Sequence, residues 1–115
     1  MVKLAGDAMN DKVFCTQAGI PLSLMPGGDE FLSRFKARFN AGVQLYAPYS
    51  YDAATALIEG MKAADSTDPA TYLPAMQKVD FKSVTGNIAF DDKGDIKEGG
   101  ISLYRYADGK WEPLK

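Results

Sequence analysis

The sequence contains no histidine and only one cysteine, Cys15. A disulfide within the chain is therefore excluded, and so are zinc sites built from cysteine and histidine. Without histidine, the chain lacks the side chain that most often acts as a general base near neutral pH, so we expect no catalysis by Cys15. Its position between Phe14 and Thr16 in a predicted strand is typical of a small core residue. We expect no catalytic residue, no metal and no cofactor.

The sequence also lacks a large excess of charge of either sign and a long apolar run. The 13 basic and 15 acidic residues give a net charge of −2, and no block of like charges indicates a nucleic acid or an anionic membrane as partner. No run is long enough to span a membrane, and "VKLAGDAMNDK" after Met1 lacks the apolar centre of a signal peptide. A leader of an exported protein would therefore lie outside this chain. What is present is 115 residues, 46% of them hydrophobic, which is enough for one folded domain.

The spacing of apolar residues predicts a strand followed by helices. Residues 12–17 alternate and are rich in β-formers, which predicts a strand, and the Gly and Pro content of residues 18–28 predicts a loop. A helix is expected over residues 29–39, and a second helix over residues 51–64 with Ser50 as its N-cap. Their expected core faces are Phe31, Leu32, Phe35 and Phe39 in the first helix, and Ala54, Leu57, Ile58 and Met61 in the second. Pro69 suits the first turn of a third, shorter helix, in which Pro74 is awkward.

The last third of the chain changes to a β pattern. Strands are predicted over Val84–Phe90 and Ile101–Tyr106, and Asp108-Gly109 is a strong hairpin signal. Asp91–Asp95 could suggest a calcium loop, but Lys93 interrupts its acidic positions. A solvated turn explains this segment better.

The string Gly27-Gly28-Asp29-Glu30-Phe31 spells the motif of the diguanylate cyclases. In that family the string lies in a hairpin turn, where glycines admit a guanine and an acidic residue binds a metal ion. Here the string follows Pro26 and leads directly into an amphipathic helix. We therefore interpret it as a helix start, with Gly28 or Asp29 as the cap and Glu30 near the positive end of the helix dipole. The cyclase stays an alternative.

Three tyrosines, Tyr46, Tyr49 and Tyr51, precede or begin the second helix in "QLYAPYSYDAA". Aromatic rings at a helix start can form the wall of an apolar pocket. They can equally pack the loop onto the core. The residues alone leave both possibilities open.

Several segments together resemble one family in order and spacing. They are "LAGDAM", "KVFCTQ", "FLSRFKARF", "YAPYSYDAATALIEGMKAA" and "STDPATYLPAMQKVDFKSVTGNIAFDDKGDIKEGGISLYRYADGKW". The chain resembles the C-terminal part of the leucine/isoleucine/valine-binding proteins, which are type I periplasmic solute-binding proteins of ABC importers. The stretches "VTGNIAFDDKGD" and "YSYDAA" are the most specific marks of this resemblance.

This resemblance implies an α/β fold of two lobes, each with a mainly parallel sheet flanked by helices, and a ligand in the cleft between them. Residues 1–18 would be the end of a second-lobe helix and strand. Residues 19–103 would be the C-terminal portion of the first lobe. Residues 104–115 would cross back and form a terminal hairpin on the second lobe.

The resemblance also implies a function and one site residue. Tyr46 occupies the position of an aromatic residue that packs on the ligand side chain in the family, and no enzymatic activity is implied. The groups that grip the ammonium and carboxylate of the amino acid lie in segments that this chain does not contain. We therefore expect weak or no leucine binding by the chain alone, self-association of the isolated chain, and a membrane permease as partner of the full-length periplasmic protein. A ligand-sensing regulatory domain of the same fold is the alternative.

Overall fold

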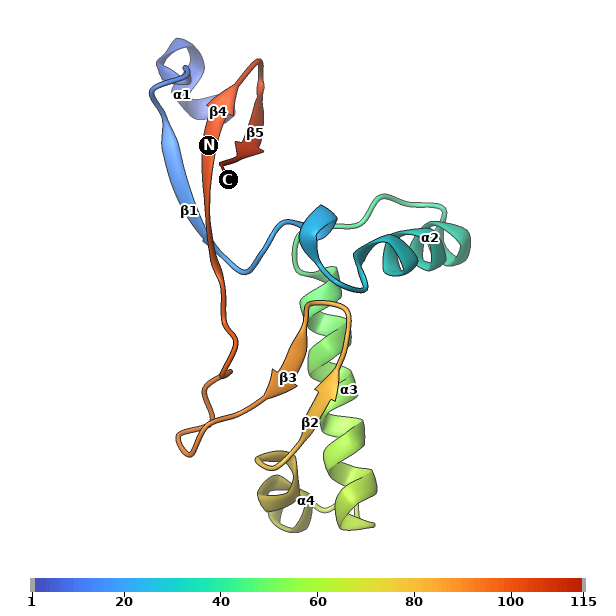
Figure 1. Ribbon diagram of the computed structural model, residues 1–115. Coiled ribbons are helices and arrows are strands. Elements are labelled where there is room, and N and C mark those ends of the chain that lie inside the picture. The colour runs from blue at the N-terminus through green and yellow to red at the C-terminus, as the bar shows by residue number, and fades with distance from the viewer. Residues whose placement is uncertain (1, 115) are drawn as a thin grey trace. The chain divides into compact units, whose positions relative to one another are not determined.

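The computed structural model describes residues 2–114, which divide into two units: the first comprises residues 2–21 and 100–114, and the second comprises residues 22–99 (Figure 1). The predicted lobe boundaries, after residues 18 and 103, lie close to these divisions, and the assignment of the units to lobes stays a prediction. The helices and strands are, in chain order, α1 (Val2–Ala5), η1 (Gly6–Ala8), β1 (Phe14–Ala18), η2 (Leu22–Leu24), α2 (Gly28–Phe39), α3 (Ala47–Ala64), α4 (Pro69–Met76), β2 (Asp80–Lys82), β3 (Asn87–Ala89), β4 (Ile101–Ala107) and β5 (Lys110–Pro113).

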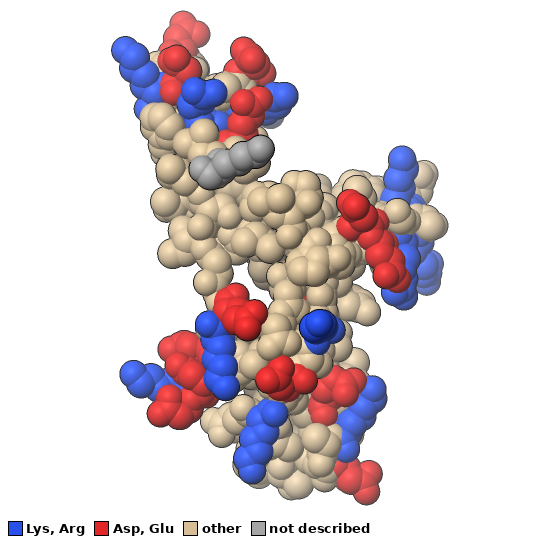
Figure 2. All heavy atoms as spheres, in the orientation of Figure 1, with Lys and Arg blue, Asp and Glu red and all other residues tan. Residues whose placement is uncertain are grey.

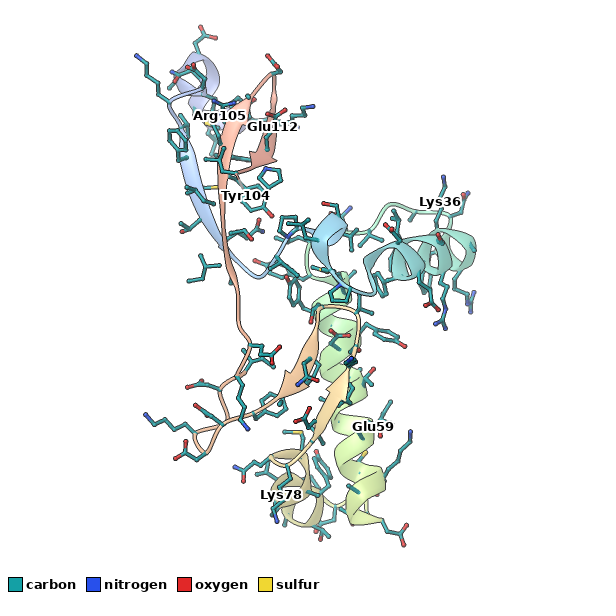
Figure 3. All side chains as sticks on the ribbon, viewed as in Figure 1. Lys36, Glu59, Lys78, Tyr104, Arg105 and Glu112 are labelled. Carbon is teal, nitrogen blue, oxygen red and sulfur yellow. The ribbon has the colours of Figure 1, made fainter. Side chains whose placement is uncertain are left out.

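The first unit is built on a three-stranded antiparallel sheet in the order β1-β4-β5. β4 and β5 form the predicted hairpin, and Asp108 and Gly109 at its tip both have positive φ, 49° and 81°, as a type I′ turn requires. Arg105 of β4 lies opposite Glu112 of β5 in the register, as Figure 3 shows. Tyr106 is buried and packs edge-on against Trp111, with ring centroids 5.4 Å apart. Long-range strand pairing and this aromatic contact therefore hold the unit together.

The second unit combines the three longer helices with the β2–β3 hairpin. α3 packs on α4, and the absence of a side chain at Gly60 lets Met76 of α4 approach closely, because a Cβ atom at Gly60 would lie 2.8 Å from that of Met76. The buried apolar residues of this unit are Met25, Ala56, Val84, Ile88 and Ala89, with Pro48 also fully enclosed. The core of the unit is therefore small and lies between α3, the hairpin and the loop before α2.

The prediction of which α3 residues face the core is wrong. The buried residues of this helix recur every fourth position and are Pro48, Asp52, Ala56 and Gly60. Leu57 and Ile58, which the apolar spacing placed in the core, are 39% and 50% exposed. Small residues allow the hairpin turn and α4 to approach the helix closely. Within the described residues, no element covers the larger apolar side chains on the other face.

The helix starts also differ from the predictions. α3 begins at Ala47, with Tyr46 as N-cap, and not after Ser50. Pro48 explains the earlier start, because the first helical turn tolerates a residue without an N–H group. Gly27, rather than Gly28 or Asp29, is the N-cap of α2. The five-residue string does form a helix start. The expected core face of α2 is found only in part, because Phe31 and Phe35 are half-buried and Leu32 and Phe39 are exposed.

The predicted strand over residues 84–90 begins later than expected, because residues 84–86 form a turn. Only Asn87–Ala89 form β3, with Phe90 in an isolated bridge to Ile96, and β3 pairs with the unpredicted β2. Val84 and Thr85 donate their N–H groups to a side chain of α3 and therefore do not extend the ladder. All strand pairs among the described residues are antiparallel, so they do not form the mainly parallel sheet that the resemblance implies.

Candidate ligand-binding site

The start of α3 presents Tyr46 at the surface of the second unit. Asn40 ends α2 in the left-handed conformation, with φ of 48°, and a short loop leads to Tyr46. The carbonyl of Tyr46 accepts the N–H of Ser50 at 2.9 Å, which fixes its backbone in the first turn of the helix. Its side chain is 70% exposed. The sequence-predicted site residue is therefore an exposed ring on a firmly held backbone.

Asp52, six residues after Tyr46 in the sequence, joins α3 to the β2–β3 turn. It is only 3% exposed. Its Oδ1 accepts the Ser83 hydroxyl at 2.6 Å and the Val84 N–H at 3.2 Å, while its Oδ2 accepts the Thr85 N–H at 2.8 Å and the Thr85 hydroxyl at 2.6 Å. Both carboxylate oxygens are thus satisfied by two donors each.

This network determines the orientation of the start of α3. A carboxylate that accepts four hydrogen bonds in a buried position is held far more rigidly than an exposed one. Because Asp52 lies six residues after Tyr46 on the same helix, the hairpin turn sets where the Tyr46 backbone lies. Sequence reasoning missed Asp52. Two signals could have found it, its four-residue spacing from Pro48 and Ala56, and the Ser-Val-Thr-Gly turn that offers matching donors.

A groove runs beside this region between α2, Tyr51 and the β2–β3 turn. It is open to solvent, with a volume of about 880 Å³. Phe31, Phe35 and Phe39 of α2 contribute neighbouring rings, and Tyr51 packs edge-on against Phe31 with centroids 5.7 Å apart. The charged residues along it are Glu30, Arg34, Arg38 and Lys82.

The three tyrosines considered in the sequence do not share one pocket. Tyr51 lines the groove, whereas Tyr46 and Tyr49 are not among its lining residues. Tyr49 is half-buried. The aromatic cluster therefore separates into one ring in the groove, one in a half-buried position and one exposed.

The other segments weighed in the sequence have structural explanations. Asp91 Oδ1 accepts the N–H groups of Lys93 and Asp95, each at 2.9 Å, which makes this segment a tight turn. Among residues 2–114 no group of three or more acidic, Cys or His residues is placed to hold a metal ion, and no helix is long and apolar enough to cross a membrane. Cys15 lies half-buried in β1.

The sequence of this chain matches a known protein family. A family model described as "Periplasmic binding protein" matches residues 1–110. The chain belongs to the periplasmic binding protein family. Among curated relatives, the Leu/Ile/Val-binding protein homolog 1 of Brucella suis is 38% identical over 96 residues, which cover 78% of this chain and 25% of the relative. The leucine-, isoleucine-, valine-, threonine- and alanine-binding protein of Pseudomonas aeruginosa is 28% identical over 81 residues, 70% of this chain and 22% of the relative.

Solved structures show the same fold as this periplasmic binding protein. A leucine-binding protein from Thermotoga maritima superposes with a TM-score of 0.80 at 18% identity, covering 99% of this chain and 33% of that one. A substrate-binding protein of an ABC transporter from Desulfitobacterium hafniense, in complex with Leu, gives 0.75 at 23% identity, covering 98% and 38%. The chain thus has the α/β fold of part of a type I periplasmic binding protein, and it spans about a quarter of the length of the curated relatives it matches.

Proposed function

We propose that these residues form the C-terminal part of the substrate-binding component of an ABC importer for leucine-like, branched-chain or other hydrophobic amino acids. The observation that carries this proposal is the exposed ring of Tyr46 at the start of a helix that a buried carboxylate holds in place. The relatives and solved structures that the chain resembles are named as binding proteins and ABC transporter substrate-binding proteins, which favours transport over a regulatory sensor.

In this proposal residues 22–99 belong to the first lobe of the full-length protein. The other unit, residues 2–21 with 100–114, belongs to its second lobe. The full-length protein works in the periplasm, closes on its ligand by a hinge motion because the ligand prefers the closed state, and presents the amino acid to a membrane permease. Closure brings the Tyr46 ring against the ligand side chain. The ring then contributes about 1–2 kcal/mol of apolar contact.

The proposal divides the ligand site between this chain and segments that it does not contain. Charge-assisted hydrogen bonds to the ammonium and carboxylate of an amino acid supply much of the affinity for such a ligand. The charged side chain of α3 that is nearest to Tyr46 in the sequence, Asp52, is buried and already accepts four hydrogen bonds, so it does not bind either group. Tyr46 therefore supplies side-chain contact and not recognition of the amino-acid backbone.

The 115-residue chain alone is expected to bind leucine weakly or not at all. A calorimetric titration with leucine should give only heats of dilution, and a titration with norleucine or phenylalanine should give the same result. Micromolar binding of leucine by this chain would contradict the proposed division of the site. Circular dichroism of the same sample is the control, because a helical spectrum shows that the titrated chain is folded.

A further inference from the structure

The chain passes between the two units twice, after Pro21 and again before Gly100. Both passages lie close to the same end of the β1–β4 ladder, whose last register pair is Ala18 with Ile101. The segment that leaves the first unit and the segment that returns to it are therefore neighbours at this border. The bonds between them determine whether the two segments move together or separately.

Three residues, Gly19, Gly100 and Ser102, join the two segments, and we call them the clasp. The N–H group of Gly19 donates to the carbonyl of Gly100 at 2.7 Å, and the hydroxyl of Ser102 donates to the carbonyl of Gly19 at 2.8 Å. Both polar groups of the Gly19 backbone are thus bonded to the returning segment. Ser102 is half-buried, which limits the competition of water for its hydroxyl.

The backbone of Gly19 explains why the clasp needs a side chain. Two opposed residues of a regular antiparallel pair exchange both backbone N–H···O bonds. Gly19 has a φ of 93°, a conformation that favours glycine, and its carbonyl accepts the hydroxyl of Ser102 instead of a ladder bond. The strand pairing therefore ends here, and the hydroxyl of Ser102 holds the two segments together just beyond it.

The two segments carry no charged side chain that could replace this hydrogen bond. Residues 13–28 and 99–104 contain no Asp, Glu, Lys or Arg. On the face that Figure 2 shows, the atoms over the C-terminal half of β1 are tan, whereas the charged atoms of the first unit gather around α1 and the β4–β5 hairpin. Removing the Ser102 hydroxyl is therefore the most direct way to loosen the clasp.

We propose that Ser102 is a positioning residue for the hinge motion of the proposed function, on which this inference rests. By holding Gly19, Ser102 makes the two segments bend together, beyond the clasp, as one two-stranded connection. Two segments that bend together have fewer accessible conformations than two segments that bend independently. Ser102 therefore restricts the directions of the hinge motion, and it lowers the conformational entropy that is lost when the full-length protein closes.

Amide hydrogen exchange of the 115-residue chain, followed by nuclear magnetic resonance, tests the clasp itself. Ser102→Ala should raise the exchange rate of the Gly19 N–H group about fivefold, because the loss of one hydrogen bond makes local opening easier. Ser102→Thr keeps a hydroxyl and should retain the slow rate. The matched control is Ser23→Ala, which removes the hydroxyl of an exposed serine in η2 and should leave this rate unchanged. An unchanged rate at Gly19 in Ser102→Ala would overturn the proposal.

Pulsed electron spin resonance tests the positioning role, which a merely structural hydrogen bond would not have. Spin labels are attached at Thr16→Cys in β1 and Ala54→Cys in α3, two exposed positions, in a chain whose native thiol is removed by Cys15→Ser. The width of the distance distribution then reports the motion between the units. Ser102→Ala should widen the distribution, whereas Ser102→Thr should keep the width of the unaltered chain.

The two measurements together separate the positioning role of Ser102 from a local one. Faster exchange at Gly19 with an unchanged distance distribution would show that Ser102 only stabilises the end of the ladder, and it would overturn the proposal. Circular dichroism checks that each variant keeps its helices. Neither measurement involves leucine, so a failure of the proposed transport function would be seen in a different experiment.

Discussion

Replacing Asp52 with alanine is expected to lower the free energy of unfolding of the second unit by about 3–5 kcal/mol. The substitution removes the acceptor of four hydrogen bonds and leaves the donors of Ser83, Val84 and Thr85 without their partner. Each buried polar group left unsatisfied costs about 1–3 kcal/mol, and the groups relax together, so the costs do not add fully. The β2–β3 turn would then detach from α3, and the start of this helix would lose its fixed position.

Urea unfolding followed by far-ultraviolet circular dichroism measures this effect, because the three longer helices lie in the second unit. Asp92→Ala is the matched control: Asp92 is exposed, and this change should alter stability by no more than about 0.5 kcal/mol. Thr85→Val should lie between the two, since it removes one hydroxyl donor and keeps the backbone N–H. Equal midpoints for the Asp52 and Asp92 variants would contradict a structural role of the carboxylate.

Alanine at Gly28 should destabilise the chain by about 2–4 kcal/mol. A Cβ atom at this position would lie 2.2 Å from the carbonyl oxygen of Leu22, which is a backbone atom and cannot turn aside. The neighbouring Gly27 is in a similar position, because its Cβ would lie 2.9 Å from Cα of Val84. The paired glycines therefore let the start of α2 approach two backbone segments closely.

Gly42→Ala is the appropriate control for Gly28→Ala. Nothing lies within 4 Å of a Cβ at Gly42, so this change should be neutral or slightly stabilising through the unfolded chain. The same urea titration compares the two variants. If Gly28→Ala and Gly42→Ala had the same urea midpoint, close backbone packing would not explain why two glycines precede Asp29. That result would contradict the structural role proposed for the glycine pair.

Local patterns predicted the elements whose formation depends on neighbouring residues. The Phe31, Phe35 and Phe39 period, the position of Pro69 in a first turn, and the Asp108-Gly109 hairpin are all present in the structure. Each rests on short-range geometry, namely helical spacing, tolerance of proline in a first turn, or positive φ in a tight turn. Such features can be inferred from sequence because no distant segment has to be known.

The face of α3 could not be inferred in the same way. Apolar spacing favours Leu57 and Ile58 as core residues, and the face that is actually buried carries Gly60 and a carboxylate. Which face packs depends on the partners available to it. Here the β2–β3 turn supplies hydrogen-bond donors and α4 requires close approach, both of which are tertiary properties.

The candidate site also combines one feature that the sequence indicated with one that depends on distant segments. The resemblance placed Tyr46 at the start of a helix, and the structure gives it an exposed ring at the N-cap of α3. Asp52, which positions that helix start, bonds to residues 31 to 33 positions away in the chain. A contact of that separation leaves little trace in a single sequence. Its role in a ligand contact of Tyr46 stays a proposal.

The measurement that tests the account most directly is calorimetry with leucine on a chimera. In this chimera, residues 1–115 replace the matching region of the Desulfitobacterium hafniense substrate-binding protein, whose complex with Leu is known. A second chimera transfers only residues 40–53, so it tests the Tyr46 segment in a host that keeps the rest of its own fold. We expect both chimeras to bind leucine. In each of them, Tyr46→Ala should weaken leucine binding by about tenfold, because apolar contact is lost. Folded chimeras that fail to bind leucine, or that bind it equally well with and without the Tyr46 ring, would contradict the proposed role of this chain.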